Sequence, residues 1–324
     1  MGVETDSYGH GGLPQQPRRR GKRWLAVLAG INLVAVALVA APSQAQTVNC
    51  TGTLTDQTIT ATVVVPTGSA CELVNVDVDG RVDVLDFADL FVNESRIRGP
   101  LTVGFSSYAE AIDSRVDGMT TMNDSFGLNT QRSRFSRLVD ARNTTFVLSS
   151  DSTHWGGVRA TGGQTVVEEA VVIGSIFTSG SEITDVYDSA VFGPITVVGA
   201  QYGSVLCKIG AALSVTVRDS DGGQVHIGDP SFFGNCGFNL MGSLRVDNNL
   251  SADIMISSNI IAGNLDCSGN NPGPFGQNNL VGGAKTGQCA SLSPAPSSTP
   301  LGIQSTGVAP RKDNIVALIA QRTG

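Results

Sequence analysis

Charged side chains recur at intervals of about nineteen residues, or twice that, in the middle of the chain. Four carboxylates (Glu94, Asp113, Asp151 and Asp188) and three arginines (Arg96, Arg115 and Arg134) follow this spacing, and Trp155 lies among them. Carboxylates bind Ca²⁺ or transfer protons, and guanidinium groups bind carboxylates through paired hydrogen bonds. If these residues share one surface, it would suit an acidic glycan, with Trp155 stacking on a sugar ring.

A purely structural explanation of these charges competes with ligand binding. A solvent-exposed sheet must be polar, and Asp and Arg on adjacent strands neutralise one another at cross-strand distance. Stacking of Arg96, Arg115 and Arg134 at one repeat position instead brings like charges together, which favours an anionic partner. Both explanations stay open at this point. The sequence contains no GxSxG, HExxH or P-loop motif, so we lean towards a protein without catalytic residues.

A repeat centred on serine places these charges. Ser95, Ser114, Ser133 and Ser152 are each nineteen residues apart, and Ser189 continues the series. A typical unit reads Ser95-Arg-Ile-Arg-Gly99 and is followed by an alternating segment with Leu101 and Val103. Alternation with period two indicates strands, and glycine between strands marks a bend. The sequence therefore predicts an all-β fold, a single parallel β-helix (β-solenoid), right-handed, with about eleven coils of about 19 residues each.

Two columns of the repeat are predicted to point into the coil interior. One is the serine column, and the other consists of Val78, Ile97, Val116, Phe135, His154, Val172, Val191, Leu240, Ile261 and Leu280. We expect its one polar member, His154, to be a hydrogen-bonded core residue. The acidic and arginine columns flank the serines with opposite parity, so their side chains are predicted to be exposed.

Both ends of the chain differ in composition from the repeat and define the expected domains. Five basic residues between positions 18 and 23, an apolar run from Leu25 to Ala41, and Ser43 and Ala45 predict a signal peptide over residues 1–45, cleaved after Ala45. An uncleaved membrane anchor is the alternative, because the run is just long enough to span a bilayer. Either way, residues 46–290 form the expected β-helix domain, in an extracellular or cell-surface location. Residues 291–324 are rich in Pro and Ser and predict a linker and a disordered tail, with a possible short helix over residues 313–321.

The six cysteines all follow the predicted signal peptide, and an even number in an exported protein favours disulfides. The first two cysteines are 21 residues apart and the last two are 22 apart, so each pair would lie on neighbouring coils. The remaining two would pair across an irregular loop. We therefore expect the pairs Cys50–Cys71, Cys207–Cys236 and Cys267–Cys289. No CxxC motif is present, so we expect no metal site, and we expect no cofactor.

Two segments late in the chain carry a family resemblance: Ala262-Gly-Asn-Leu-Asp-Cys-Ser-Gly-Asn-Asn-Pro272 and Val281-Gly-Gly-Ala-Lys-Thr-Gly-Gln-Cys289. They resemble coils of secreted bacterial parallel β-helix proteins of unknown function, of the pectin-lyase-like type, whose coils are usually longer than these. For the fold, the resemblance covers about residues 48–290. It implies a parallel β-helix. In polysaccharide lyases of that fold, acidic side chains hold Ca²⁺ against an acidic sugar while an arginine abstracts the proton.

Composition narrows the choice of function. The formal net charge is −7 and no basic run lies outside the N-terminal segment, which argues against a nucleic-acid partner. We expect a secreted or cell-surface module that is structural or adhesive, without catalysis, and that contacts acidic extracellular or cell-wall polysaccharide. The alternative is a polysaccharide lyase or glycoside hydrolase of the β-helix class. A membrane partner is expected only if residues 1–45 stay attached.

Overall fold

The computed structural model describes residues 46–210, 212–228, 236, 238–293 and 308–323. The predicted signal peptide or anchor and the cleavage position at Ala45 lie outside the described residues. Among the residues that are described, no helix is both long enough and apolar enough to cross a membrane.

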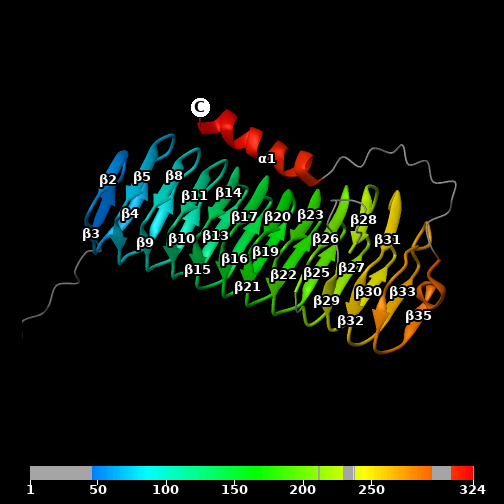
Figure 1. Cartoon of the computed structure of the whole chain (residues 1–324). Coiled ribbons are helices and arrows are strands. Elements are labelled where there is room, and N and C mark those ends of the chain that lie inside the picture. Colours follow the sequence, from blue (N-terminus) through cyan, green and yellow to red (C-terminus); the bar gives the residue numbers. More distant parts are fainter. Residues whose placement is uncertain (1–45, 211, 229–235, 237, 294–307, 324) are drawn as a thin grey trace, which may run out of the picture. The chain divides into compact units, whose positions relative to one another are not determined.

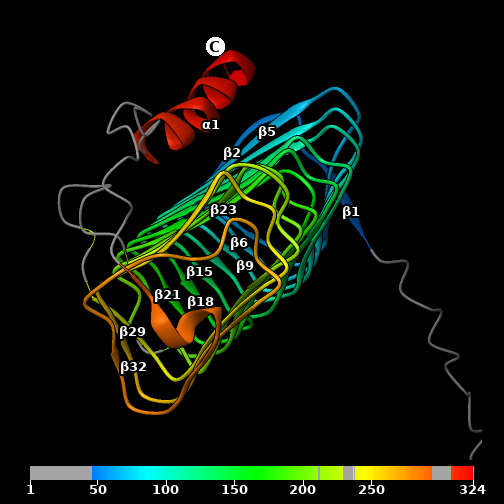
Figure 2. The same ribbon diagram turned by 90° about the vertical axis from the view of Figure 1, so that its right-hand side faces the viewer.

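The described part of the chain between Thr47 and Gly287 forms a parallel β-solenoid, as the repeat predicts. Figure 1 shows its coils side by side, following the sequence from blue to orange, and Figure 2 looks along the stack. Most coils contribute one strand to each of three sheets, and the strands pair in parallel with those of the neighbouring coils. Typical partners, such as Leu101 and Thr120, are nineteen residues apart.

The first sheet, sheet A, has 13 strands. They are β1 (Thr47–Asn49), β4 (Thr62–Val65), β7 (Val82–Val84), β10 (Leu101–Val103), β13 (Thr120–Asn123), β16 (Val139–Arg142), β19 (Val158–Thr161), β22 (Ile176–Ser179), β25 (Ile195–Val198), β27 (Val215–Arg218), β30 (Leu244–Asp247), β33 (Leu265–Ser268) and β35 (Lys285–Gly287). The thirteen strands mark about twelve turns, one more than the expected eleven, and β35 begins an incomplete last turn.

Sheet B follows sheet A in each coil and has 11 strands. They are β2 (Gly52–Thr55), β5 (Ala70–Val74), β8 (Asp89–Asn93), β11 (Tyr108–Ile112), β14 (Gly127–Gln131), β17 (Phe146–Ser150), β20 (Gln164–Glu168), β23 (Ile183–Tyr187), β26 (Gly203–Cys207), β28 (Gln224–Ile227) and β31 (Asp253–Ile256).

Sheets C and D complete the coils with short strands. Sheet C has 8 strands: β3 (Thr58–Ile59), β6 (Asp77–Val78), β9 (Arg96–Ile97), β12 (Arg115–Val116), β15 (Arg134–Phe135), β18 (Thr153–His154), β21 (Val171–Val172) and β24 (Ala190–Val191). Sheet D has 3 strands: β29 (Asn239–Met241), β32 (Asn259–Ile261) and β34 (Leu280–Val281).

The serine column lies buried at the corner between sheets B and C and continues the hydrogen bonding between coils. The backbone N–H of Ser114 donates to Ser133 Oγ at 3.0 Å, and that hydroxyl lies 2.9 Å from the carbonyl oxygens of Ala111 and Gln131. A strand ladder cannot turn a corner without leaving backbone groups unpaired, and a buried unpaired N–H or C=O is costly. The serines supply the missing partners, which explains why a polar residue recurs inside the coil.

The apolar column of sheet C is confirmed, except at two positions near the C-terminal end. Ile97, His154 and the other predicted members from Val78 to Val191 are fully buried. Leu240 and Leu280, which we expected inside, are 48% and 67% exposed. Met241 is buried in place of Leu240. In these two coils, an asparagine takes the place of the corner serine. It lies one residue later in the repeat than the glycine spacing indicated, so the inward and outward positions that follow it are shifted by one residue.

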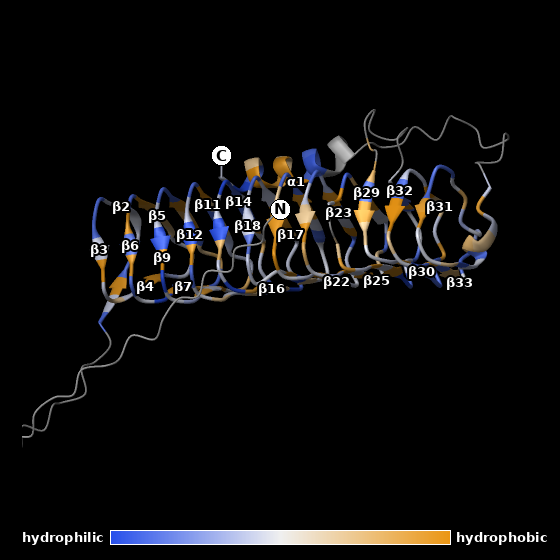
Figure 3. Ribbon diagram, turned by 60° about the horizontal axis from the view of Figure 1, so that its bottom comes forward, coloured by the Kyte–Doolittle hydropathy of each residue, from blue (hydrophilic) through white to orange (hydrophobic). Residues whose placement is uncertain are grey.

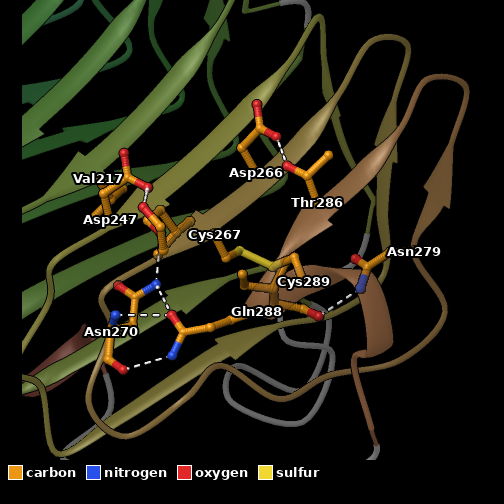
Figure 4. The surroundings of a disulfide bond; sticks show 12 residues. Val217, Asp247, Asp266, Cys267, Asn270, Asn279, Thr286, Gln288 and Cys289 are labelled. Atoms are coloured by element: carbon orange, nitrogen blue, oxygen red, sulfur yellow. Dashed lines mark hydrogen bonds between the residues drawn. A yellow bond between two sulfur atoms is a disulfide. The ribbon is translucent and has the colours of Figure 1, made fainter.

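All three predicted disulfides are present, with Cα–Cα distances of 5.4 Å for Cys50–Cys71 and 5.2 Å for the pairs Cys207–Cys236 and Cys267–Cys289. Figure 4 shows the last pair, which joins β33 to the 3-10 helix η1 (Gln288–Ser291). Beside it, Gln288 Oε1 accepts a hydrogen bond from Asn270 N at 2.9 Å, and Gln288 Nε2 donates to the Asn270 carbonyl at 2.9 Å. The last coil is therefore tied down by a covalent bond and a side-chain cap.

The C-terminal segment differs from the expected disordered tail, because Val308–Thr323 forms a helix, α1. The predicted helix covered only residues 313–321 and had no assigned role. Ile315 of α1 is fully buried in a cluster with Tyr108, Phe146 and Val166 of sheet B. The composition of the tail gave no sign of this contact, because it depends on an apolar surface more than a hundred residues away.

Candidate ligand-binding face

The three arginines of the predicted site lie in one row on the outer face of sheet C. Arg96, Arg115 and Arg134 occupy paired positions on β9, β12 and β15. Neighbouring parallel strands lie about 4.8 Å apart, so the row repeats a guanidinium at each coil. The row forms because Ile97, Val116 and Phe135, one residue later on each strand, point into the core.

Asp117 holds two of these arginines. Its carboxylate accepts hydrogen bonds from Arg96 Nε at 2.8 Å, Arg115 Nε at 2.5 Å and Ser136 Oγ at 2.8 Å. Burial alone would raise the pKa of Asp117, but these donors outweigh it and lower the pKa to about 2. Asp117 is therefore ionised at neutral pH and compensates part of the positive charge of the row.

The predicted acidic residues lie at the corner where sheet B meets sheet C. Glu94, Asp113, Asp151 and Asp188 all have left-handed backbone conformations, with φ of 49°, 50°, 50° and 42°. This conformation is uncommon for residues other than Gly, Asn and Asp, and here every coil from Asp56 to Lys208 adopts it at the corner. The backbone bend sets the carboxylates along the exposed edge beside the arginine row.

Several corner carboxylates are already engaged with neighbours one coil away. Arg132 donates to both oxygens of Asp113 at 2.7 Å, and this pairing lowers the pKa of Asp113. Lys208 Nζ lies 3.1 Å from Asp188. Asp151 instead meets another acid, since a hydrogen bond with Asp151 raises the pKa of Glu169. The corner therefore carries two neutralised acid–base pairs, with one pair of carboxyl groups between them.

A groove of about 530 Å³ runs along the N-terminal half of this face. It is lined by Asp56, Gln57, Thr58, Asn75, Val76, Asp77, Glu94, Ser95, Arg96, Asp113, Ser114 and Arg115. The groove brings together four of the eight predicted site residues: Glu94, Arg96, Asp113 and Arg115. The other four (Arg134, Asp151, Trp155 and Asp188) do not line it and lie on later coils.

Arg134 and Trp155 mark the transition to an apolar half of the same face. The Arg134 guanidinium carbon lies 4.4 Å from the centre of the Trp155 ring, and Trp155 is 49% exposed. Further along the face, Ile173 and Phe192 are also exposed. Figure 3 shows the change from hydrophilic colours at β9 and β12 to hydrophobic colours at β29 and β32.

His154 belongs to the core, as expected, and takes no part in this face. Its ring is fully buried, and its Nε2 lies 2.8 Å from Ser149 Oγ. Within the described residues, no three His, Cys, Asp or Glu side chains come together in a way that could hold a metal ion.

Asp117 and Arg132 had no role assigned from the sequence, although both occupy predicted outward positions. Their repeat positions alone could have placed them beside the arginine row, but the choice of partner depends on side-chain conformations. The groove-lining residues of the first coil, including Asp56, were missed because the recognisable repeat begins one coil later.

No family model matches the chain, and neither curated proteins nor solved structures gave a match. Without such a match, the function of this face follows only from the chemistry of its own residues.

Proposed function

We propose that this protein is an exported, non-catalytic module that binds acidic polysaccharide along the outer face of sheet C. The row formed by Arg96, Arg115 and Arg134 carries the proposal. A polyuronate presents carboxylates at regular intervals, and a row of guanidinium groups at one per coil is a matching set of donors. Trp155, next to Arg134, offers an exposed ring for the apolar face of a sugar.

The compensation by Asp117 affects how strong such binding would be. It holds Arg96 and Arg115 in place on the groove floor, which reduces the conformational entropy they lose when a ligand binds. Arg134 has no ion-pair partner among the described residues and stacks on Trp155. We therefore assign Arg134 the largest contribution to anion binding.

Export is the second part of the proposal. The basic segment, apolar run and small residues within positions 18–45 support a secretory signal. Three disulfides are compatible with an oxidising compartment, where such bonds persist. N-terminal sequencing of the exported chain tests this part: a start at Gln46 supports cleavage, and retention of residues 1–45 favours the anchor.

Affinity electrophoresis of the full chain in gels containing pectate or alginate tests glycan binding. We expect retardation of the wild type and about tenfold weaker binding for Arg134→Gln, because one charge-assisted contact is lost. Arg159→Gln is the matched control, since Arg159 stacks on Phe177 on the outer face of sheet A. Absence of retardation, or equal weakening in both variants, would contradict the proposal.

A glycoside hydrolase or polysaccharide lyase is the second candidate, favoured by the Asp151–Glu169 pair. Hydrogen bonding to Asp151 raises the pKa of Glu169, as suits a general acid beside a second carboxylate. Incubation with pectate or alginate, with and without Ca²⁺, distinguishes these functions. New reducing ends that disappear in Glu169→Gln would identify a hydrolase, and unsaturated products that disappear in Arg115→Ala would identify a lyase.

A further inference from the structure

The outer face of sheet B is apolar in the middle coils, which is unusual for the outside of a solenoid. Its aromatic rings form a chain of contacts: Phe91 to Tyr108 at 5.9 Å, Tyr108 to Phe126 at 6.1 Å and Phe126 to Phe146 at 5.5 Å between ring centres. Leu148 and Val166 extend this surface and are buried. We call these six residues the sheet B patch. Left uncovered, a patch of this kind would be a site for association.

The helix α1 covers the sheet B patch through one stripe of side chains. Lys312, Ile315, Ile319 and Arg322 are spaced by three, four and three residues, which places them on one face of a helix. Ile315 is fully buried in the cluster that contains the patch, and Ile319 packs against it. The Arg322 guanidinium carbon lies 5.0 Å from the centre of the Phe126 ring.

Charges at both ends of the stripe set the position of α1 along the coils. Lys312 pairs with Glu168 of β20, and Arg322 pairs with Asp89 of β8 at 2.9 Å. Four strand spacings separate β8 from β20, about 19 Å, and the ten-residue step from Lys312 to Arg322 spans about 15 Å along a helix. Long Lys and Arg side chains cover the difference. The solenoid thus offers carboxylates at the spacing of the helix's cations.

This docking is shallow. Ile315 is the only fully buried residue among the α1 side chains that the structure describes, and Val316 is 46% exposed. An isolated helix of sixteen residues is marginal in water, so α1 depends on the sheet B patch for its stability. The two ion pairs are partly exposed and contribute little. Release of α1 is therefore accessible, and it uncovers the patch.

We propose that the sheet B patch, together with Asp89 and Glu168, is a helix-binding site that also accepts α1 from a second copy of this chain. None of the contacts requires helix and patch to belong to one molecule. Fourteen residues, 294–307, separate α1 from the last described residue of the solenoid. Docking within one chain is favoured by effective concentration, and exchange between copies restores every contact at higher protein concentration. This inference is independent of the proposed glycan binding.

Two full-chain variants with complementary defects test the exchange. Ile315→Asp with Ile319→Asp leaves the patch intact and disables the helix. Asp89→Arg with Glu168→Arg leaves the helix intact and repels its cations from the patch. We expect each variant alone to sediment as a monomer and their equimolar mixture to form a 1:1 dimer. A mixture that stays monomeric, with both variants folded by circular dichroism, would overturn the proposal.

A matched control variant and a peptide distinguish specific binding of α1 from non-specific association of the exposed patch. Val316→Asp with Ala320→Asp adds the same charges on exposed positions of α1 and should leave the helix docked, without dimer formation in the same mixture. A labelled peptide of residues 308–323 should bind saturably to the Ile315→Asp, Ile319→Asp variant and at least tenfold more weakly to the wild type, whose site is occupied. Equal peptide binding to both would also contradict the proposal.

Discussion

His154 stacks on Phe135 inside the solenoid, with ring centres 5.3 Å apart and planes inclined by 18°. The two residues occupy the same position in consecutive coils, where the other members of the column from Val78 to Val191 are apolar. Complete burial lowers the pKa of His154 from 6.5 to about 4, because a charged imidazolium would lose its hydration. The imidazole is therefore held neutral at physiological pH and behaves as a flat core residue.

The first prediction concerns the pH dependence of stability. The unfolded chain binds a proton at His154 below about pH 6.5, whereas the folded chain resists it until about pH 4. The unfolded state thus holds more protons in this window, so stability falls as the pH drops through it, by up to about 3 kcal/mol from this group. Urea unfolding at a series of pH values measures this loss.

His154→Val provides the control, because Val172 fills the same position one coil later. The variant should lose part of its stability at neutral pH but show a smaller further loss between about pH 6.5 and 4 than the wild type. Equal slopes in the two proteins would mean that His154 is not the titrating group.

A second prediction concerns the glycines at the corner between sheets C and A. A Cβ built on Gly118 would lie 2.1 Å from the carbonyl oxygen of Gly99. Gly118→Ala should therefore push two coils apart and lower the stability by about 1–3 kcal/mol, as overpacking does. Gly210→Ala is the matched change, because nothing lies within 4 Å of its Cβ position. A similar loss of melting temperature in both would show that close coil approach is not the cause.

A third prediction follows from the serine corner. Ser133→Ala removes the acceptor of the Ser114 N–H and leaves the carbonyl oxygens of Ala111 and Gln131 without this donor. The buried groups lose their partner, so the free energy of unfolding should fall by about 1–3 kcal/mol in chemical denaturation. Thr102→Ala, at an exposed position of β10, should change it by less than about 0.5 kcal/mol. An equally small effect of Ser133→Ala would show that the corner hydroxyls do not stabilise the fold.

A fourth prediction concerns the disulfides at the two ends of the solenoid. Cys50–Cys71 and Cys267–Cys289 close segments of 21 and 22 residues, and each should stabilise the fold by about 2–4 kcal/mol. A reducing agent should therefore lower the melting temperature of the wild type. In a variant with Ala at all six cysteines, the same agent should have no effect. An unchanged wild-type melting curve would indicate that the end coils hold without the disulfides.

Much of the architecture follows from local patterns in the sequence. The nineteen-residue spacing of Ser95, Ser114 and Ser133 determines the coil length, and side-chain alternation then decides which residues face the core, such as Ile97. The arginine row follows from the same argument. These predictions succeed because parallel stacking repeats one local geometry at every coil. Residues one repeat apart in the sequence are therefore neighbours in the structure.

Other features were decided only by tertiary structure. Leu240 and Leu280 face outward because Asn239 and Asn279 take the serine's place in the hydrogen bonding between coils, a choice invisible in the glycine spacing. Asp117 joins Arg96 to Arg115 because its side chain can reach both, and spacing does not specify side-chain conformations. The burial of Ile315 in the cluster that contains Phe146 depends on residues far apart in the chain meeting in space. Periodicity determines contacts between neighbouring coils, whereas the partner of an exposed apolar patch depends on whichever distant segment can cover it.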